Sequence, residues 1–193
     1  MRITGGKFRG RNLKIPKSGE IRPTQDRVRE SLFNIIQCEL AGAEFLDLFA
    51  GSGAVGIEAL SRGAASAAFV ERDRRHAAVL AENLKTFNLQ PPAFSLVSAD
   101  VYRWIAAYAG GGFDIVFADP PYALGEEKGY SGVLATLAER GVVKPGGLFI
   151  AEMTAVQKAE ESPGWELLRD RTYGKTRILI WRRTGTGEMK GES

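Results

Sequence analysis

The sequence has little of what disulfide-bonded, metal-bound or membrane-spanning proteins need. Its one cysteine, Cys38, excludes an intramolecular disulfide and any zinc site built from several cysteines. No apolar run approaches the roughly 20 residues that cross a bilayer, and residues 1–6 lack the apolar stretch of a secretory signal. The one histidine, His76, lies among arginines and small residues, where we expect a surface position on a helix. We therefore expect a cytoplasmic protein that uses neither a metal ion nor a membrane.

The charge of the chain is unevenly distributed. Of the 193 residues, 44% are hydrophobic and 25% are charged, which is typical of one globular domain with a small appendage. Residues 1–29 hold nine Lys or Arg and two acids, a net charge of +7. Because the whole chain carries +3, the remainder carries −4. A basic segment on a mildly acidic body favours a polyanionic partner such as nucleic acid, although a solvated basic surface explains the charge equally well.

Three parts are expected along the chain. Residues 1–21 alternate glycines, charges and isolated apolar residues, which predicts a small basic β-hairpin arm. Residues 22–183 are expected to form the main domain, beginning with a helix that Thr24 caps. The polar, glycine-rich residues 184–193 predict a disordered tail. Arginines at or near the start of that helix are expected to line a surface near a ligand: Arg22, Arg27 and Arg29.

From residue 44 onward, short apolar runs alternate with amphipathic segments. The predicted strands are residues 45–49, 67–70, 94–97, 113–118 and 147–151, each followed or preceded by a helical pattern. Repeated β-α units predict an α/β fold with a mostly parallel sheet and helices on both of its faces. Two last strands, residues 165–168 and 177–181, have no helix between them and are expected to form an antiparallel hairpin at the sheet edge.

A glycine loop follows the first predicted strand. Gly51-Ser52-Gly53-Ala54-Val55-Gly56 matches the pattern G-x-G-x-x-G and opens a helix. Glycine permits the tight turn and lets a ligand approach the backbone. Nicotinamide, flavin and S-adenosylmethionine enzymes all use such loops, and a structural turn can mimic them. The phosphate-binding Walker loop is excluded, because no Lys-Ser or Lys-Thr follows the glycines.

Acids near this loop narrow the choice of ligand. Glu71 ends the second strand, 20 residues after Gly51, where an acid can accept hydrogen bonds from ribose hydroxyls. Asp47 would repel a pyrophosphate but suits the ammonium and sulfonium of S-adenosylmethionine. Asp100 can accept a hydrogen bond from an adenine amine, cap the next helix, or do both. The pattern predicts a nucleoside-containing cofactor, best fitted by S-adenosylmethionine, with these binding residues: Asp47, Gly51, Gly53, Glu71 and Asp100.

The segment Asp119-Pro120-Pro121-Tyr122 follows the fourth predicted strand, at the edge where such folds bind ligands. The exocyclic amine of a nucleic-acid base is a poor nucleophile, because its lone pair is delocalised into the ring. Two acceptors, the Asp119 carboxylate and the Pro120 carbonyl, can favour an electron-rich nitrogen facing a methyl donor. Tyr122 offers a face on which the base can stack. The alternative is a proline turn that ends a strand, with the tyrosine covering the core.

Together these segments resemble the class I, Rossmann-like S-adenosylmethionine methyltransferases. More narrowly, the chain is similar to the bacterial 16S rRNA guanine-N2 methyltransferase family, on the following segments: Ile3-Thr4-Gly5-Gly6 with Gly10-Arg11, Arg22-Pro23-Thr24 with Arg27-Val28-Arg29-Glu30, Asp47 to Gly53, and Asp119 to Tyr122. The resemblance implies strand order 3-2-1-4-5-7-6 with an antiparallel last strand. It also implies methylation of N2 of one guanine on an assembled or assembling small ribosomal subunit. The catalytic role would fall on Asp119, Pro120 and Tyr122, and the expected RNA contacts are Lys7, Arg9, Arg11, Arg22 and Arg27.

Other functions fit the pattern less well. A DNA adenine-N6 methyltransferase uses the same tetrapeptide, but no target-recognition domain is evident. A protein-glutamine methyltransferase usually has Asn where Asp119 stands, and a nicotinamide dehydrogenase would need a substrate domain. A non-catalytic RNA-binding protein remains an alternative that the intact acids and glycines disfavour. Basic residues of the last two strands either extend an RNA surface or are solvated edge charges: Arg169, Arg171, Lys175, Arg177, Arg182 and Arg183.

Overall fold

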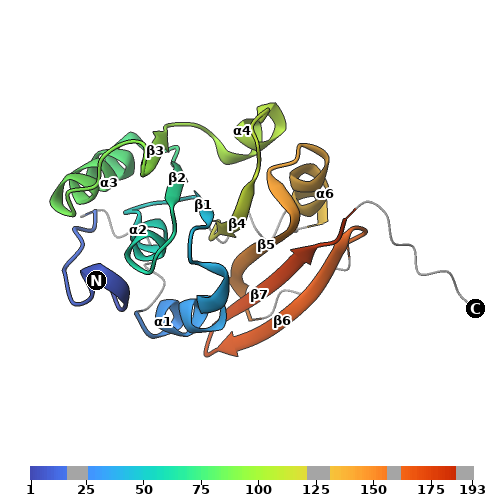
Figure 1. The fold of residues 1–193 in the computed structure, drawn as a ribbon, viewed down its shortest axis with the longest axis horizontal. Coiled ribbons are helices and arrows are strands. Elements are labelled where there is room, and N and C mark those ends of the chain that lie inside the picture. Colours follow the sequence, from blue (N-terminus) through green and yellow to red (C-terminus); the bar gives the residue numbers. More distant parts are fainter. Residues whose placement is uncertain (17–25, 121–130, 156–161, 186–193) are drawn as a thin grey trace, which may run out of the picture.

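The fold is a seven-stranded sheet with helices on both faces (Figure 1). The computed structural model describes residues 1–16, 26–120, 131–155 and 162–185. The strand order is β3-β2-β1-β4-β5-β7-β6, as the family resemblance implies. The strands are β1 Glu44–Leu48, β2 Ser66–Val70, β3 Phe94–Val97, β4 Phe113–Ala118, β5 Val143–Thr154, β6 Trp165–Tyr173 and β7 Thr176–Arg183. Strands β1 to β5 run parallel, and β7 pairs antiparallel with both β5 and β6, which confirms the predicted edge hairpin.

Two hydrophobic cores lie on the two faces of this sheet. One packs α1 (Asp26–Ile35), α2 (Ala54–Ser61) and α3 (Arg74–Thr86) against strand residues such as Phe45 and Phe117. The other packs α4 (Val101–Ala107) and α6 (Ser131–Glu139) against residues such as Leu46 and Val116. Neighbouring residues of one strand enter different cores because side chains alternate across a strand. Figure 1 shows the same division, with α1 to α3 on one side of the sheet.

Strand β5 is longer than the sequence predicts. The turn residues 144–147 lie inside it as an irregularity, between the pairs Phe113↔Val143 and Ile115↔Leu148. Pairing with β4 on one side and β7 on the other carries the strand to Thr154. The sequence predicts a strand that begins only at residue 147, after this turn, whereas the structure includes the turn within the strand.

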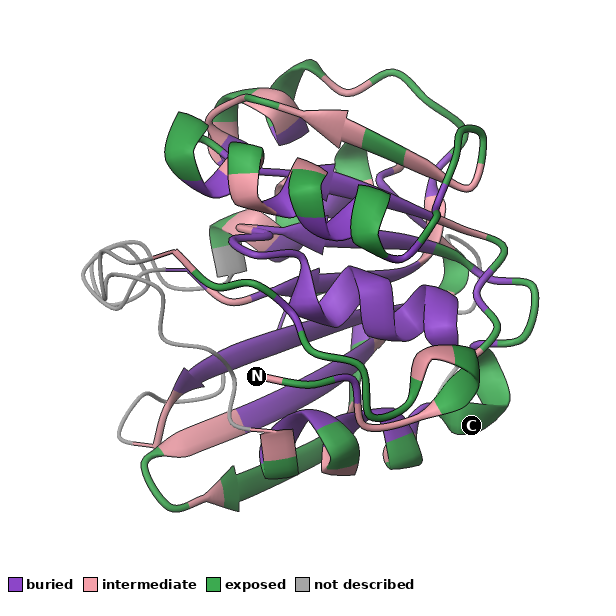
Figure 2. Cartoon of the chain, turned by 90° about the vertical axis from the view of Figure 1, so that its left-hand side faces the viewer, coloured by how far each residue is buried: buried purple, intermediate pink, exposed green. Residues whose placement is uncertain are grey.

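The predicted N-terminal hairpin is not confirmed. Residues 1–16 fold back on themselves through the Ile3 N–H, which donates to the Arg11 carbonyl at 3.0 Å, and the Leu13 N–H, which donates to the Met1 carbonyl at 3.0 Å. They contain the 3-10 turn η1 (Gly6–Phe8) and one isolated bridge, but no strand. Ile3 and Leu13 are buried in the core that contains α2. Figure 2 shows this segment crossing in front of α2, whose eight residues are all buried.

A buried ion-pair network attaches this N-terminal segment to the domain. Glu58 of α2 is fully buried and accepts hydrogen bonds from Arg29 Nε at 2.6 Å and Arg62 Nε at 3.0 Å. The backbone N–H of Thr4 donates to the same carboxylate at 3.3 Å. Arg29 also donates to the Arg2 carbonyl. The expectation that Arg29 lines a ligand surface is wrong, because its side chain is fully buried as the partner of a buried acid.

Candidate active site

The parallel strands end at one level, which brings the predicted site residues to one edge. Residues Val70, Leu48 and Ala118 pair across β2, β1 and β4. Ala118 in turn pairs with Ala151 of β5. The residues that follow these positions therefore meet at the carboxyl edge of the sheet, where ligands of open α/β folds bind.

The glycine loop leaves β1 in a backbone conformation that only glycine adopts readily. Gly51 and Gly53 have φ values of 55° and 79°, in the left-handed region. A Cβ on Gly53 would lie 2.1 Å from Leu80 Cδ1, and one on Gly56 would lie 2.3 Å from the Phe69 ring. Both positions therefore exclude a side chain, and the first turn of α2 can pack directly under the loop. Phe49, just before the loop, also has a positive φ of 62°, a strained conformation for a non-glycine residue.

Asp47 lies under the loop as a buried acid. Its Oδ2 accepts a hydrogen bond from the Gly56 N–H at 2.9 Å. Burial raises the pKa of the Asp47 carboxyl from its ordinary 3.8 to about 7; the Gly56 N–H opposes the rise, and the charge of Glu71 adds to it. A cationic ligand group beside Asp47 would favour its ionised form.

Glu71 connects the glycine loop to the start of α3. One carboxylate oxygen accepts the Gly51 N–H at 2.8 Å, and the other accepts the Asp73 N–H at 2.7 Å. His76 Nδ1 lies 4.0 Å from Glu71 Oε1. Our expectation of a surface position for His76 is wrong, because only 9% of the residue is exposed. The Asp73 cap at the N-terminus of α3 accepts the His76 N–H and holds that first turn near Glu71.

Asp100 acts as a helix cap. Its Oδ1 accepts the Arg103 N–H at 3.2 Å at the start of α4, which confirms one of the two predicted roles. Its Oδ2 lies 3.7 Å from the guanidinium of Arg72. The side chain is 32% exposed, so a ligand can still reach it.

Asp119 follows β4 at the same edge. It comes directly after Ala118, whose strand neighbours are Leu48 of β1 and Ala151 of β5. Asp119 is half-buried and Pro120 is buried. The register thus places Asp119 beside the strand that carries Asp47 and the glycine loop. Tyr122 lies outside the described residues.

Sequence reasoning missed two buried polar residues near the site. Glu152 comes directly after Ala151 of β5 and is 8% exposed. The signal was available, because an acid directly after an apolar strand also marks Glu71 and Asp119. Asn83 of α3 is fully buried, and its Nδ2 donates to the Ser52 carbonyl at 2.9 Å and the Lys14 carbonyl at 3.0 Å. No sequence signal points to Asn83, because its partners lie 31 and 69 residues away.

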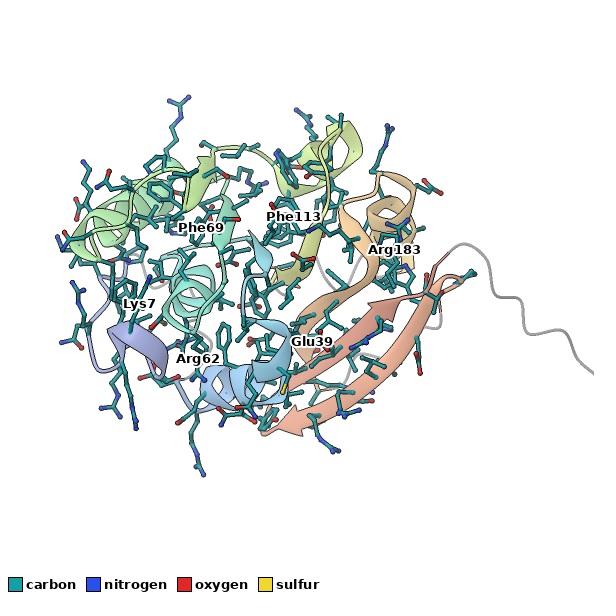
Figure 3. The ribbon with its side chains drawn as sticks, in the orientation of Figure 1. Lys7, Glu39, Arg62, Phe69, Phe113 and Arg183 are labelled. Atoms are coloured by element: carbon teal, nitrogen blue, oxygen red, sulfur yellow. The ribbon has the colours of Figure 1, made fainter. Side chains whose placement is uncertain are left out.

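The predicted RNA contacts do not gather at this edge. The Phe8 N–H donates to Ser61 Oγ at 2.9 Å, and Arg11 donates to the Thr86 carbonyl. Ser61 and Thr86 end α2 and α3, so the turn that carries Lys7 and Arg9 lies at the opposite, amino edge of the sheet. Figure 3 shows Lys7 near Arg62, which directly follows α2. Lys7, Arg9 and Arg27 are exposed, the Arg11 guanidinium packs over the Phe87 ring at 4.5 Å, and Arg22 lies outside the described residues.

Three of the six basic residues named for the last two strands bond to groups that are not their neighbours in the sequence. Arg177 pairs with Asp170 at 2.8 Å, Arg182 with Glu39 at 2.8 Å, and Arg183 donates to the Ala138 carbonyl at 2.8 Å. Figure 3 shows Arg183 at the α6 side of the sheet. The other three are exposed: Arg169, Arg171 and Lys175.

The strand order, the glycine loop and the acids at the carboxyl edge define a class I methyltransferase. The model of the family described as Conserved hypothetical protein 95 matches residues 1–182, and the chain belongs to this family. Among the described residues, no helix is long and apolar enough to span a membrane. The same residues contain no group of three or more His, Cys, Asp or Glu that would hold a metal ion.

Relatives of known name support this assignment. The chain is 37% identical over 195 residues to "Ribosomal RNA small subunit methyltransferase D" of Escherichia coli K12, covering 100% of this chain and 94% of that protein. It is 34% identical over 177 residues to the protein of the same name from Haemophilus influenzae, covering 90% and 89%. A solved Escherichia coli structure with a methyltransferase assignment superposes with a TM-score of 0.85 at 33% identity, over 96% of this chain and 99% of that one. These relatives confirm the family resemblance and the methyltransferase class.

Proposed function

We propose that the protein transfers a methyl group from S-adenosylmethionine to the exocyclic N2 amine of one guanine in 16S rRNA. The observation that carries this proposal is the position of Asp119, one residue past β4 and beside the strand that leads into the glycine loop. The names of its relatives support an rRNA substrate from the small ribosomal subunit. We place the reaction in the cytoplasm, on an assembled or assembling subunit.

The described residues fit this cofactor. S-adenosylmethionine supplies an electrophilic methyl group on a sulfonium, which leaves as a neutral thioether. Asp47 offers a buried negative charge to the cationic part, and the two left-handed glycines let the ligand approach the loop backbone. Each carboxylate oxygen of Glu71 accepts one backbone N–H. A second lone pair on each oxygen can therefore accept a hydrogen bond from a ribose hydroxyl. The accessible Asp100 is assigned to the adenine amine.

Asp119 and Pro120 are assigned to the acceptor base. The Asp119 carboxylate and the Pro120 carbonyl accept the two N–H groups of the amine, which turns its lone pair toward the methyl carbon. Bound S-adenosylmethionine would supply the methyl carbon to this nitrogen, and its sulfur would keep the electron pair of the broken carbon–sulfur bond. The nitrogen then carries a positive charge and gives one proton to Asp119. Tyr122 is assigned to stacking against the flipped base.

The basic residues are assigned to a second contact with the RNA. Lys7, Arg9 and Arg11 lie past the far end of α2, which has eight residues. At 1.5 Å per residue, this helix alone separates them from the glycine loop by about 12 Å. Arg27 on α1 and Arg22 complete the proposed set. The RNA would therefore be held by its backbone at some distance from the target base.

One assay separates this function from its alternatives. The protein is incubated with labelled S-adenosylmethionine and, separately, unmethylated 30S subunits, free 16S rRNA and duplex DNA, and the modified nucleoside is identified. We expect N2-methylguanosine from the subunits. N6-methyladenosine from DNA would support the adenine-N6 alternative, and RNA binding without any transfer would support a non-catalytic RNA-binding protein.

A further inference from the structure

A second carboxylate stands beside Asp119 in the register of the sheet. Strands β4 and β5 are parallel neighbours, and their last common pair is Ala118↔Ala151. Asp119 directly follows β4, and Glu152 is the next residue of β5. Neighbouring strands are about 4.8 Å apart, so the two backbones bring these acids next to one another.

The two acids also lie on one face of the sheet. Phe117 and Ile150 pair in register and belong to the same hydrophobic core. Because side chains alternate with a period of two, Asp119 and Glu152 follow them on that face. The β7 partner of Glu152, Ile178, belongs to the same core. Asp47 of β1 also lies on this face, where it bonds the N–H of Gly56 in α2.

Glu152 is buried at this position. It is 8% exposed, and removing a carboxylate from water carries a large free-energy cost. The residue before it, Ala151, and the residue two before it, Ile150, are fully buried and apolar. On this face Glu152 is the last buried residue of β5, since Thr154 is only partly buried. A carboxylate has several acceptor positions, so Glu152 can accept a ligand N–H in addition to its interaction within the protein.

The chemistry of the bases indicates which ligand group fits. In guanine, the N2 amine is flanked by the N1–H donor on one side. In adenine and cytosine, the corresponding ring nitrogen beside the amine is an acceptor. With Asp119 and the Pro120 carbonyl on the amine, a further acceptor beside Asp119 matches guanine, because only guanine has an N–H donor next to its amine.

We propose that Glu152 is the specificity-determining residue that accepts the N1–H of the target guanine while Asp119 accepts the N2 amine. The inference rests on the proposed function and adds to it a physical reason for the choice of guanine. An adenine placed in the same site would turn its N1 lone pair toward the Glu152 carboxylate. The repulsion disfavours adenine, and the hydrogen bond to N1–H favours guanine.

The test uses a base that keeps the amine and lacks the neighbouring donor. In 2,6-diaminopurine, the 2-amino group is retained, N1 is an acceptor and an amine replaces the 6-oxygen, so the Glu152→Gln variant is needed to assign a loss to N1. Once the target guanine is mapped, this base is placed at its position by ligating a synthetic fragment into the rRNA. We expect kcat/KM of the unaltered protein to fall about 100-fold, because a hydrogen bond to a charged group is lost and an acceptor faces a carboxylate.

The variant Glu152→Gln sharpens the test. The glutamine amide can donate to N1 of 2,6-diaminopurine, so we expect the preference for guanine to shrink from about 100-fold to less than about fivefold, consistent with the loss of one charged hydrogen bond. Glu166→Gln, an exposed acid on β6, is the matched control and should keep the full preference. Binding of S-adenosylhomocysteine by Glu152→Gln should match that of the unaltered protein, which shows that the site is folded. An unchanged guanine preference in Glu152→Gln would overturn the proposal.

The outcome remains decisive even if Glu152→Gln does not fold. The unaltered protein alone suffices, because equal use of guanine and 2,6-diaminopurine would exclude any reading of N1–H. This failure differs from failure of the proposed function. In the first case guanine in rRNA is methylated without discrimination, whereas in the second it is not methylated at all.

Discussion

The two edges of the sheet differ in charge and in burial. At the carboxyl edge, Asp47, Glu71 and Glu152 are all less than 10% exposed. At the amino edge, Lys7 and Arg9 are exposed cations on a turn that packs against the end of α2. Buried charges act strongly over short distances, whereas exposed charges act weakly and are screened by salt. This fold therefore separates the groups suited to chemistry from those suited to holding a polyanion.

The largest effect is expected at Asp119. Replacing Asp119 by Ala removes the carboxylate acceptor of the target amine, and we expect kcat to fall by about 1,000-fold or more. The dissociation constant of S-adenosylhomocysteine should stay within about twofold, because the described cofactor residues lie on β1, β2 and the loops after them and after β3. Single-turnover transfer and calorimetric titration measure the two quantities. Preserved turnover would remove Asp119 from the mechanism.

A smaller effect, on cofactor binding, is expected from the titration of Asp47. Because the pKa of Asp47 is about 7, a large share of its carboxyl is neutral near neutral pH. A cationic cofactor gains from this carboxyl only in the ionised form. We expect S-adenosylhomocysteine to bind about tenfold more weakly at pH 6 than at pH 8, since a pKa near 7 leaves about a tenth of the carboxyl ionised at pH 6. Asp47→Asn should remove this dependence. A pH slope that survives in Asp47→Asn would assign the titration to another group.

The same pKa shift has a consequence for stability, with the opposite dependence on pH. The folded, ligand-free protein favours the protonated carboxyl, while the unfolded chain ionises near 3.8. The raised pKa of Asp47 therefore stabilises the folded protein fully below about pH 3.8, and this contribution to the free energy of unfolding is lost as the pH rises to about 7. Denaturant unfolding at several pH values should show this loss in the unaltered protein and not in Asp47→Asn.

The fold and most of the carboxyl edge could be predicted from sequence because their signals are local. Apolar runs at strand spacing mark the strands, and Asp47, Glu71 and Asp119 each lie at or directly beyond one. The N-terminal segment could not be predicted in the same way. Its glycines and charges indicate a hairpin, but burial of Ile3 and Leu13 against a helix some 50 residues away replaces strand pairing.

Buried polar residues were missed for a related reason. Arg29 is buried because Glu58 lies beside it, and Asn83 is buried because Lys14 and Ser52 supply its partners. Such partners meet only after the helices pack, so no periodic pattern marks them. Glu152 differs, since its position directly after the predicted strand 147–151 was visible in the sequence.

Asn83 links the N-terminal segment to the glycine loop, and we expect the loss of this link to have an intermediate effect on cofactor binding. Asn83 Oδ1 accepts the Lys14 N–H at 2.9 Å, and its Nδ2 bonds the Ser52 carbonyl of the glycine loop. Lys14→Pro removes that N–H, and we expect S-adenosylhomocysteine binding to weaken about fivefold, the size of one net hydrogen bond. Lys14→Ala keeps the backbone bond and loses only the exposed ion pair to Glu82, so its affinity should not change. Equal affinities in the two variants would mean that the N-terminal segment does not position the loop.

The smallest effect is expected at Arg9, which would show whether the two edges act separately. Arg9→Ala should weaken rRNA binding about threefold at moderate salt and lower the salt slope by about 0.7–0.9, as for one lost phosphate contact. Its kcat should not change, because Arg9 lies at the far end of α2 from the glycine loop. Arg140→Ala, an exposed arginine just after α6 on the other face, is the matched control and should leave the salt slope unaltered. If Arg9→Ala lowers kcat with saturating rRNA, RNA binding and methyl transfer are not separated between the two edges. An exposed cation at the amino edge would then be acting on the transfer step.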